Sequence, residues 1–224
     1  MSILIVAAHP DDEVLGCGGT IRRHTEAGER VDILFVCDGV SARGQRADGS
    51  EGEIRREAGR KAAEILGTQV PRFLDFQDNQ LDTISLLSVV QAIEKVLAEL
   101  RPHTIYTHHS GDLNIDHSLI NRAVLTACRP QPEGLVKNIY AFEVVSSTEW
   151  AEPAHGKAFI PCHFVDIEPY LDTKLAALEA YSFEMRPFPH PRSAEAVMAL
   201  ARWRGSCAGL ASAEAFQVLR QIID

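Results

Sequence analysis

Four ionisable side chains lie close together near the N-terminus, in the segment AAHPDDEVLGCGG that directly follows the apolar run SILIV. They are His9, Asp11, Asp12 and Glu13. Acidic groups this close together repel and desolvate one another at a cost in free energy unless a cation compensates them. His9 and Asp12 are three residues apart across a turn, and an imidazole and a carboxylate that converge there form half of a zinc site. The spacing therefore predicts a bound divalent metal.

A second polar segment, SGDLNIDH, supplies a candidate for the remaining ligand. A catalytic zinc usually has three protein ligands and a water, and His117 at the end of this segment is the best candidate for the third. Adjacent side chains diverge, so Asp11 can accept a proton from the water while Asp12 binds the metal. Such a site is suited to the attack of water on a carbonyl. The alternative is that the two aspartates simply cap a helix N-terminus.

Composition restricts the class of protein. The chain is 46% hydrophobic and 24% charged, which is typical of a globular domain, and its formal charge of −9 argues against nucleic acid or an anionic membrane as partner. The five cysteines are scattered and lack C-x-x-C spacing, which favours a reducing compartment over a disulfide framework or a cysteine zinc site. No apolar run approaches the roughly 20 residues of a spanning helix. We expect a cytoplasmic protein without membrane insertion.

Apolar runs alternate with helical patterns, which predicts an α/β fold with an open, mostly parallel Rossmann-like sheet, helices on both faces and a mainly helical C-terminal extension. A single domain is expected over residues 1–224, with a core over 1–150 and a strand and helices over 151–224 that complete the site. Strands are expected at 2–8, 30–39, 71–76, 103–109, 136–147 and 163–167. Helices are expected at 19–28, 53–67, 84–102, 118–130, around 168–184, 193–205 and 212–223.

Both polar segments follow expected strands, as does Asp38 after the second strand. Ligands of such sheets bind outside the carboxyl ends of the strands, so these side chains are expected to meet at one edge. The segment GCGG does not match G-x-G-x-x-G, which disfavours a dinucleotide-binding module. These glycines are expected to permit a tight turn and close packing of the following helix.

The motif AHPDDE-x-LG-x-GG with a downstream D-x-N-x-DH resembles the PIG-L/LmbE-like family of zinc-dependent N-deacetylases. The segments RREAGRKAAEILG, FQDNQLD and EVVSSTEW extend the likeness over about residues 3–185. The resemblance implies a Rossmann-like fold and removal of an N-acetyl group from an N-acetylglucosamine-type conjugate. It also implies Zn²⁺, with Fe²⁺ or another divalent metal as the alternative in the cell. Matched residue by residue, the metal ligands are His9, Asp12 and His117, and the general base is Asp11, in agreement with the spacing.

One position departs from the family pattern. Several members have a histidine where this chain has Asn114. An asparagine amide can donate a hydrogen bond to an oxyanion but cannot be a cationic acid, so proton delivery falls on protonated Asp11 or on a histidine of another loop. Asp116 is predicted either to bind a ligand imidazole or to cap its helix. Of His108 and His109, one is expected to be buried and one to lie at the pocket wall.

Five further residues are predicted to contact substrate. Arg55 resembles a substrate-binding arginine of the family, although a solvated helix face is the alternative and Arg56 competes for the role. By the same resemblance, Asp78 is expected to meet a sugar hydroxyl. Asp112 is expected either to order its loop or to meet a sugar hydroxyl. His190 and Arg192 lie in the proline-rich segment EMRPFPHPRS, which could close over the substrate and supply the acid or an anion clamp.

The sequence thus predicts a metal-dependent hydrolase of a small N-acetyl amino sugar conjugate. Hydrolysis of another amide or ester at the same metal is one alternative, and a non-catalytic metal- or sugar-binding protein is another. Whether the chain forms homo-oligomers stays open. Glu13 has no role that follows from the residues, although the resemblance suggests a supporting hydrogen bond.

Overall fold

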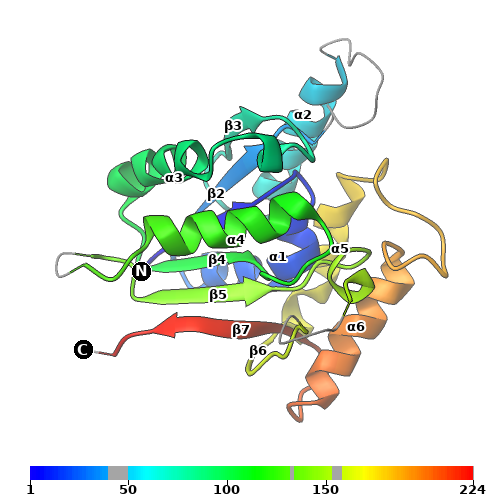
Figure 1. The fold of residues 1–224 in the computed structure, drawn as a ribbon. Helices are drawn as coiled ribbons and strands as arrows, with labels where there is room; N and C mark the ends of the chain where they lie inside the picture. The colour runs from blue at the N-terminus through cyan, green and yellow to red at the C-terminus, as the bar shows by residue number, and fades with distance from the viewer. Residues whose placement is uncertain (40–49, 132–133, 153–157, 224) are drawn as a thin grey trace.

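A twisted, mostly parallel sheet forms the centre of the molecule (Figure 1). The computed structural model describes residues 1–39, 50–131, 134–152 and 158–223. Within them seven strands pair in the order β3-β2-β1-β4-β5-β7-β6. Their bounds are Ser2–Ala7 (β1), Arg30–Cys37 (β2), Arg72–Phe76 (β3), Thr104–His108 (β4), Asn138–Phe142 (β5), His163–Asp166 (β6) and Ala213–Gln221 (β7). The first five strands are parallel and β7 is antiparallel to both of its neighbours. The Rossmann-like prediction is confirmed.

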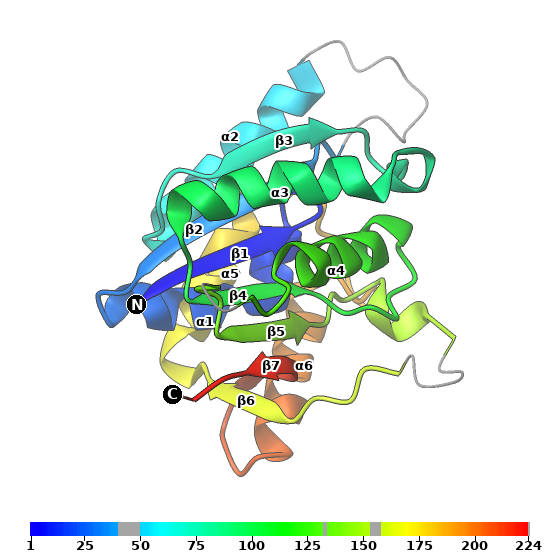
Figure 2. The same ribbon diagram turned by 60° about the vertical axis from the view of Figure 1, so that its left-hand side comes forward.

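Helices cover both faces of this sheet, as Figures 1 and 2 show from two sides. α3 and α4 share one apolar core with the sheet, while α1, α2, α5 and α6 contribute to the other. The bounds are Asp12–Glu26 (α1), Ser50–Leu66 (α2), Leu86–Leu100 (α3), Ile115–Ala127 (α4), Leu171–Glu179 (α5) and Ala194–Ser206 (α6), with short turns at Leu81–Thr83 (η2), Thr148–Trp150 (η3) and Glu168–Tyr170 (η4). Because both faces are covered, β1 is a continuous apolar run, with Ile3 to Ala7 buried.

The first helix begins earlier than predicted, at Asp12 instead of residue 19. The carbonyl of Asp11 accepts hydrogen bonds from the N–H groups of Val14 and Leu15 at 3.1 and 3.0 Å, so helical bonding starts directly after the HPDD turn. The glycines therefore lie inside the helix and do not form a turn. A Cβ atom on Gly19 would lie 2.7 Å from the Cβ of Ile167, which confirms the predicted close packing.

The predicted C-terminal helix over 212–223 is wrong, because this segment is strand β7. Its alanines, glutamate, glutamines and leucine favour a helix locally. However, β5 and β6 each offer an unpaired edge, and Phe216 aligns with Phe142 on one side and His163 on the other. Pairing on both edges outweighs a weak local preference.

Other boundaries also differ from the prediction: the strand expected at 136–147 covers only Asn138–Phe142. α4 begins at Ile115, so Asp116 and His117 lie in its first turn and not in the preceding loop. The helix predicted around 168–184 is a 3₁₀ turn followed by α5, which ends at Glu179. Among the residues that the structure describes, no helix combines the length and apolar character needed to cross a membrane.

Candidate metal and catalytic site

The two polar segments meet at the carboxyl edge of the sheet, where β1 and β4 lie side by side. A cavity of about 160 Å³ opens there. It is lined by His9, Asp11, Gly39, Arg55, Asp78, Asn79, Asn114, Glu184 and Arg192. Segments that are distant in sequence therefore contribute to one polar pocket, and three of the five predicted substrate residues, Arg55, Asp78 and Arg192, are among its walls. Asp112 and His190 are not.

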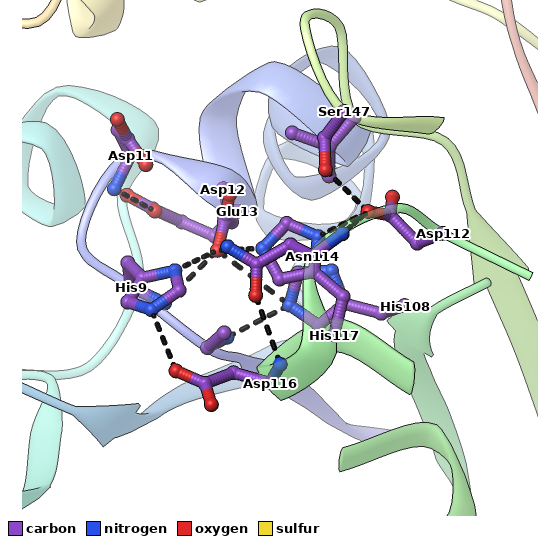
Figure 3. A network of polar contacts seen from close by, with 12 residues as sticks. His9, Asp11, Asp12, Glu13, His108, Asp112, Asn114, Asp116, His117 and Ser147 are labelled. Atoms are coloured by element: carbon purple, nitrogen blue, oxygen red, sulfur yellow. Dashed lines mark hydrogen bonds and ion pairs between the residues drawn. The ribbon is translucent and has the colours of Figure 1, made fainter. Parts of the chain in front are cut away.

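The three predicted metal ligands converge beside this cavity, which His9 lines, and Figure 3 shows their side chains together. Asp12 Oδ2 lies 3.2 Å from His9 Nδ1 and 3.2 Å from His117 Nε2. One donor atom from each residue lies within 4.8 Å of the other two, and all three side chains are buried. Asp12 Oδ1 and His117 Nε2 have no hydrogen-bond partner among the described residues. These two unsatisfied atoms, together with His9 Nδ1, give a donor set of the types N, O and N that fits a divalent cation such as zinc.

The charges of His9, Asp12 and His117 shift one another's pKa values. Burial alone lowers the pKa of His117, but the nearby carboxylates of Asp12 and Asp112 outweigh it and raise that pKa to about 9. Burial also lowers the pKa of His9, and its hydrogen bonds to Asp116, Asp12 and Asp78 raise it well above the usual value. The pKa of Asp12 moves the other way: burial raises it, and the two histidines hold it well below its usual range. The cluster therefore keeps Asp12 ionised.

A second convergence, formed by His9, Cys37 and Asp116, shares one residue with the first. Burial raises the pKa of the Cys37 thiol to about 12. A metal ligand must be a thiolate, so this group is less suited to hold a metal than the two histidines with Asp12.

Each histidine of this cluster has a carboxylate on the side away from Asp12. Asp112 Oδ1 lies 3.2 Å from His117 Nδ1, and Asp112 is held in turn by the hydroxyls of Ser147 and Thr148. Asp116 Oδ2 lies 3.2 Å from His9 Nε2. Such pairs fix the orientation and tautomer of a ligand imidazole.

Asp116 also accepts hydrogen bonds from the backbone N–H groups of Asn79 and Leu81, at 2.6 and 3.2 Å. Of its two predicted roles, the structure shows the contact with an imidazole, that of His9. The helix cap is Asn114, whose side-chain oxygen accepts from the N–H of Asp116 at 2.9 Å. Asp112 orders its own loop as well, because it accepts from the N–H of Asn114 at 2.9 Å.

Asp11 has an unusual environment. Its backbone φ is 133°, a region that side-chain-bearing residues rarely adopt. Its Oδ2 accepts a hydrogen bond from Arg192 Nη1 at 2.7 Å, whereas its buried Oδ1 has no partner among the described residues. Burial raises the pKa of Asp11 to about 6, against the opposing effect of Arg192. This carboxyl group can therefore exchange a proton near neutral pH.

The proline-rich segment, residues 184–193, contributes Glu184 and Arg192 to the cavity wall. Arg192 Nε donates to Ser146 Oγ at 2.8 Å in addition to binding Asp11. His190 supports it by accepting the backbone N–H of Arg192 at 3.1 Å, and the His190 ring packs against Trp150 instead of facing the cavity. Arg192 thus contacts Asp11 of the HPDDE motif across 181 residues of sequence.

Arg55 lies in the cavity wall and not on a solvated helix face, being 5% exposed. It forms an ion pair with Glu184 and its guanidinium lies 5.6 Å from the centre of the Phe183 ring. The sequence analysis missed three residues of the site: Glu184, Asn79, and Ser147, whose hydroxyl donates to Asp112. The segments FQDNQLD and EVVSSTEW contain the last two. Glu184 is the first residue of the segment EMRPFPHPRS, but nothing in that segment indicated Arg55 as its partner.

The histidines that end β4 are both buried. His108 Nε2 accepts a hydrogen bond from the N–H of Ala8 at 2.7 Å, and its ring stacks on His117 at 3.9 Å. Burial lowers the pKa of His108 to about 3, so it is neutral. His109 bonds Gln217 at 2.7 Å and is not a cavity wall.

One family model and several known proteins are similar to this chain. A family model described as PIG-L, GlcNAc-PI de-N-acetylase, matches residues 4–128. The chain is 31% identical over 186 residues to an uncharacterized deacetylase, YaiS, of Escherichia coli, across 80% of this chain and 89% of that protein. It is 30% identical over 199 residues to a 4-oxalmesaconate hydratase of Pseudomonas putida, across 80% of this chain and 72% of that protein.

Among solved structures, N,N'-diacetylchitobiose deacetylase from Pyrococcus horikoshii superposes with a TM-score of 0.79 at 20% identity. The match covers 98% of this chain and 84% of that one, which is a likeness of fold. The family match spans β1 to α4 and includes both segments that converge on the metal-type cluster. The chain belongs to the PIG-L family.

Proposed function

We propose that this protein is a metal-dependent hydrolase that removes the N-acetyl group from an amino sugar conjugate and releases acetate. The observation that carries this proposal is the convergence of His9, Asp12 and His117. Beside them lies Asp11, one of whose carboxylate oxygens has no hydrogen-bond partner among the described residues. Membership of a family described as de-N-acetylases and the likeness to a protein named as a deacetylase support it.

His9 Nδ1, Asp12 and His117 Nε2 are the groups that would hold a zinc ion. A zinc ion bound there polarises a carbonyl and lowers the pKa of a water molecule. The protein holds both imidazoles in place through Asp116 and Asp112, so their metal-facing nitrogens point at the same place.

Asp11 is the proposed general base. Arg192 occupies Oδ2, so Oδ1 is the atom left to accept a proton from the attacking water. The same oxygen can then deliver that proton to the departing amine, because a carboxyl pKa of about 6 allows both states near neutral pH. This assignment supplies the acid that Asn114 cannot be.

The Asn114 amide has a separate proposed role. Its oxygen is engaged by the N–H of Asp116, which leaves the amide N–H groups to donate, and the residue lines the cavity. We assign these donors to the oxyanion that forms when water adds to the acetyl carbon. Arg55 and Asp78, in the same walls, are assigned to the polar groups of the sugar.

A second function has one specific observation in its favour, the 30% identity to a hydratase. Hydration of an unsaturated acid also needs an activated water, and the guanidinium groups of Arg55 and Arg192 in the cavity could bind carboxylates. These guanidiniums already face Glu184 and Asp11, however, so they offer little uncompensated positive charge.

An acetate-release screen tests the proposal. Zinc-loaded protein is incubated with N-acetylglucosamine conjugates that differ at the anomeric carbon, and with unsaturated dicarboxylic acids as the competing class. Asp11→Asn, which keeps an oxygen for Arg192, is the matched control and is expected to lose about 10²–10⁴-fold in kcat with zinc retained. Water addition to the acids without acetate release, or zinc binding with neither reaction, would overturn the proposal.

A further inference from the structure

Glu13 is the member of the HPDDE motif that the proposed chemistry does not use. Its side chain is completely buried at the start of α1, yet it faces neither the metal-type cluster nor the cavity lining. Its Oε2 accepts the backbone N–H of Asp11 at 3.0 Å, and its Oε1 accepts the hydroxyl of Tyr181 at 2.6 Å. Both oxygens are therefore engaged, one by the residue proposed as base.

Tyr181 is also fully buried and follows α5, 168 residues along the chain from Glu13. A glutamate in the first turn of a helix is usually explained by the helix dipole, and such a residue is normally exposed to solvent. Burying a carboxylate that has no cation partner costs free energy. A favourable interaction of Glu13 with the helix dipole would not, moreover, require a tyrosine from another element. The pair thus needs a further explanation.

The backbone of Asp11 supplies that explanation. A residue with φ of 133° costs about 1–3 kcal/mol and persists only where its surroundings over-determine it. Here Glu13 holds the peptide N–H of Asp11, while Arg192 holds its carboxylate at the other end. With both ends held, Oδ1 is left as the unpaired oxygen of Asp11.

We propose that Glu13 and Tyr181 are positioning residues that hold the Asp11 peptide so that Oδ1 faces the reacting water. The inference rests on the proposed function, because it concerns the base of that reaction. A shift of about 1 Å in a catalytic group can cost about 10²-fold in rate. The hydrogen bond from the Asp11 peptide to Glu13, and the hydrogen bond from Tyr181 that holds Glu13, are therefore sufficient to matter.

Four variants test this. Glu13→Gln keeps an oxygen for the Asp11 N–H and can donate to the Tyr181 oxygen, so we expect near-normal kcat. Glu13→Leu removes both contacts at similar size and is expected to lower kcat by about 10–100-fold, and Tyr181→Phe by about 3–10-fold. KM and zinc content are expected to stay unchanged. Tyr106→Phe is the control, since Tyr106 is also buried and its hydroxyl bonds His24 at 3.0 Å, outside the site.

Amide hydrogen exchange at Asp11, followed by NMR, gives a readout that does not depend on activity. It is expected to accelerate in Glu13→Leu and Tyr181→Phe, and to stay slow in Glu13→Gln and Tyr106→Phe. Unchanged exchange, or a loss of zinc or a rise in KM that accompanies the fall in kcat, would overturn the positioning role. If the wild-type protein releases no acetate but the exchange pattern holds, the proposed function fails and the hydrogen-bond pair stands. Should Glu13→Leu fail to fold, Tyr181→Phe and Glu13→Gln still decide.

Discussion

Helix α1 is broken one turn after it begins. At Cys17 the backbone leaves the helical region, with φ −149° and ψ 26°. The break frees the N–H groups of Gly19 and Thr20, which donate to the two carboxylate oxygens of Glu214 at 2.9 and 2.7 Å. A side chain from β7 therefore caps the second part of a helix whose first turn carries a proposed metal ligand.

Lys174 of α5 caps the other side of the break. Its ammonium donates to the carbonyl of Leu15 at 2.9 Å and to Glu214 at 2.6 Å. Both charged side chains are 4% exposed, so water does not screen the pair. Removal of one partner from a buried ion pair costs about 3–5 kcal/mol, because it leaves the other charge uncompensated.

Lys174→Met is therefore expected to lower the free energy of unfolding by about 3–5 kcal/mol. That is a large part of the roughly 5–15 kcal/mol available to a typical protein. In Lys174→Met/Glu214→Gln no charge stays buried, and the amide oxygen can still accept one helix N–H. The double variant is expected to lose less than the sum of the single variants, with a coupling energy of about 0.5–3 kcal/mol.

Urea-induced unfolding, followed by circular dichroism for the wild type, both single variants and the double variant, measures these energies. Lys174→Arg, which retains the charge, is the matched control for changes in packing. A loss below about 1 kcal/mol in Lys174→Met, the size typical of an exposed pair, would refute the reasoning. So would additivity of the two single substitutions.

Three other predictions concern the site and its packing. Asp112→Asn removes the carboxylate behind His117 and is expected to weaken zinc binding by about 10–100-fold in a chelator competition, and unchanged affinity would contradict the contact. Arg192→Met removes the cation that lowers the pKa of Asp11, so that pKa rises and the acid limb of the kcat/KM profile moves to higher pH; a shift to lower pH would contradict this sign. Gly19→Ala places a Cβ 2.7 Å from a core isoleucine and is expected to cost about 1–3 kcal/mol in urea unfolding, whereas a neutral effect would show that the helix can move away.

Much of the fold and the proposed metal ligands could be predicted from the sequence because the relevant signals are local. A buried parallel strand must be apolar along its length, and the run before His9 shows this directly. A ligand pair at the end of such a strand reaches the sheet edge by chain geometry alone. His117 was found for the same reason, since it follows another strand of the same sheet.

Partners that are distant in sequence were not predictable in this way. Arg192 could be placed near a substrate, but its contact with Asp11 depends on how the proline-rich segment packs. Whether Asp116 contacts an imidazole or caps its helix was likewise open, and the structure shows the contact with His9. The contact between Asp112 and His117 was not predicted at all.

The sequence by itself determined the order of strands and helices over the first two thirds of the chain and the residues able to bind a metal. Only the tertiary structure decided that residues 213–221 form a strand, which hydrogen bond Glu13 makes, and which acid caps the broken helix. The physical reason is that propensity and periodicity act over a few neighbouring residues. A sheet edge, a buried acid or a freed N–H group is paired instead by whichever distant segment packs beside it.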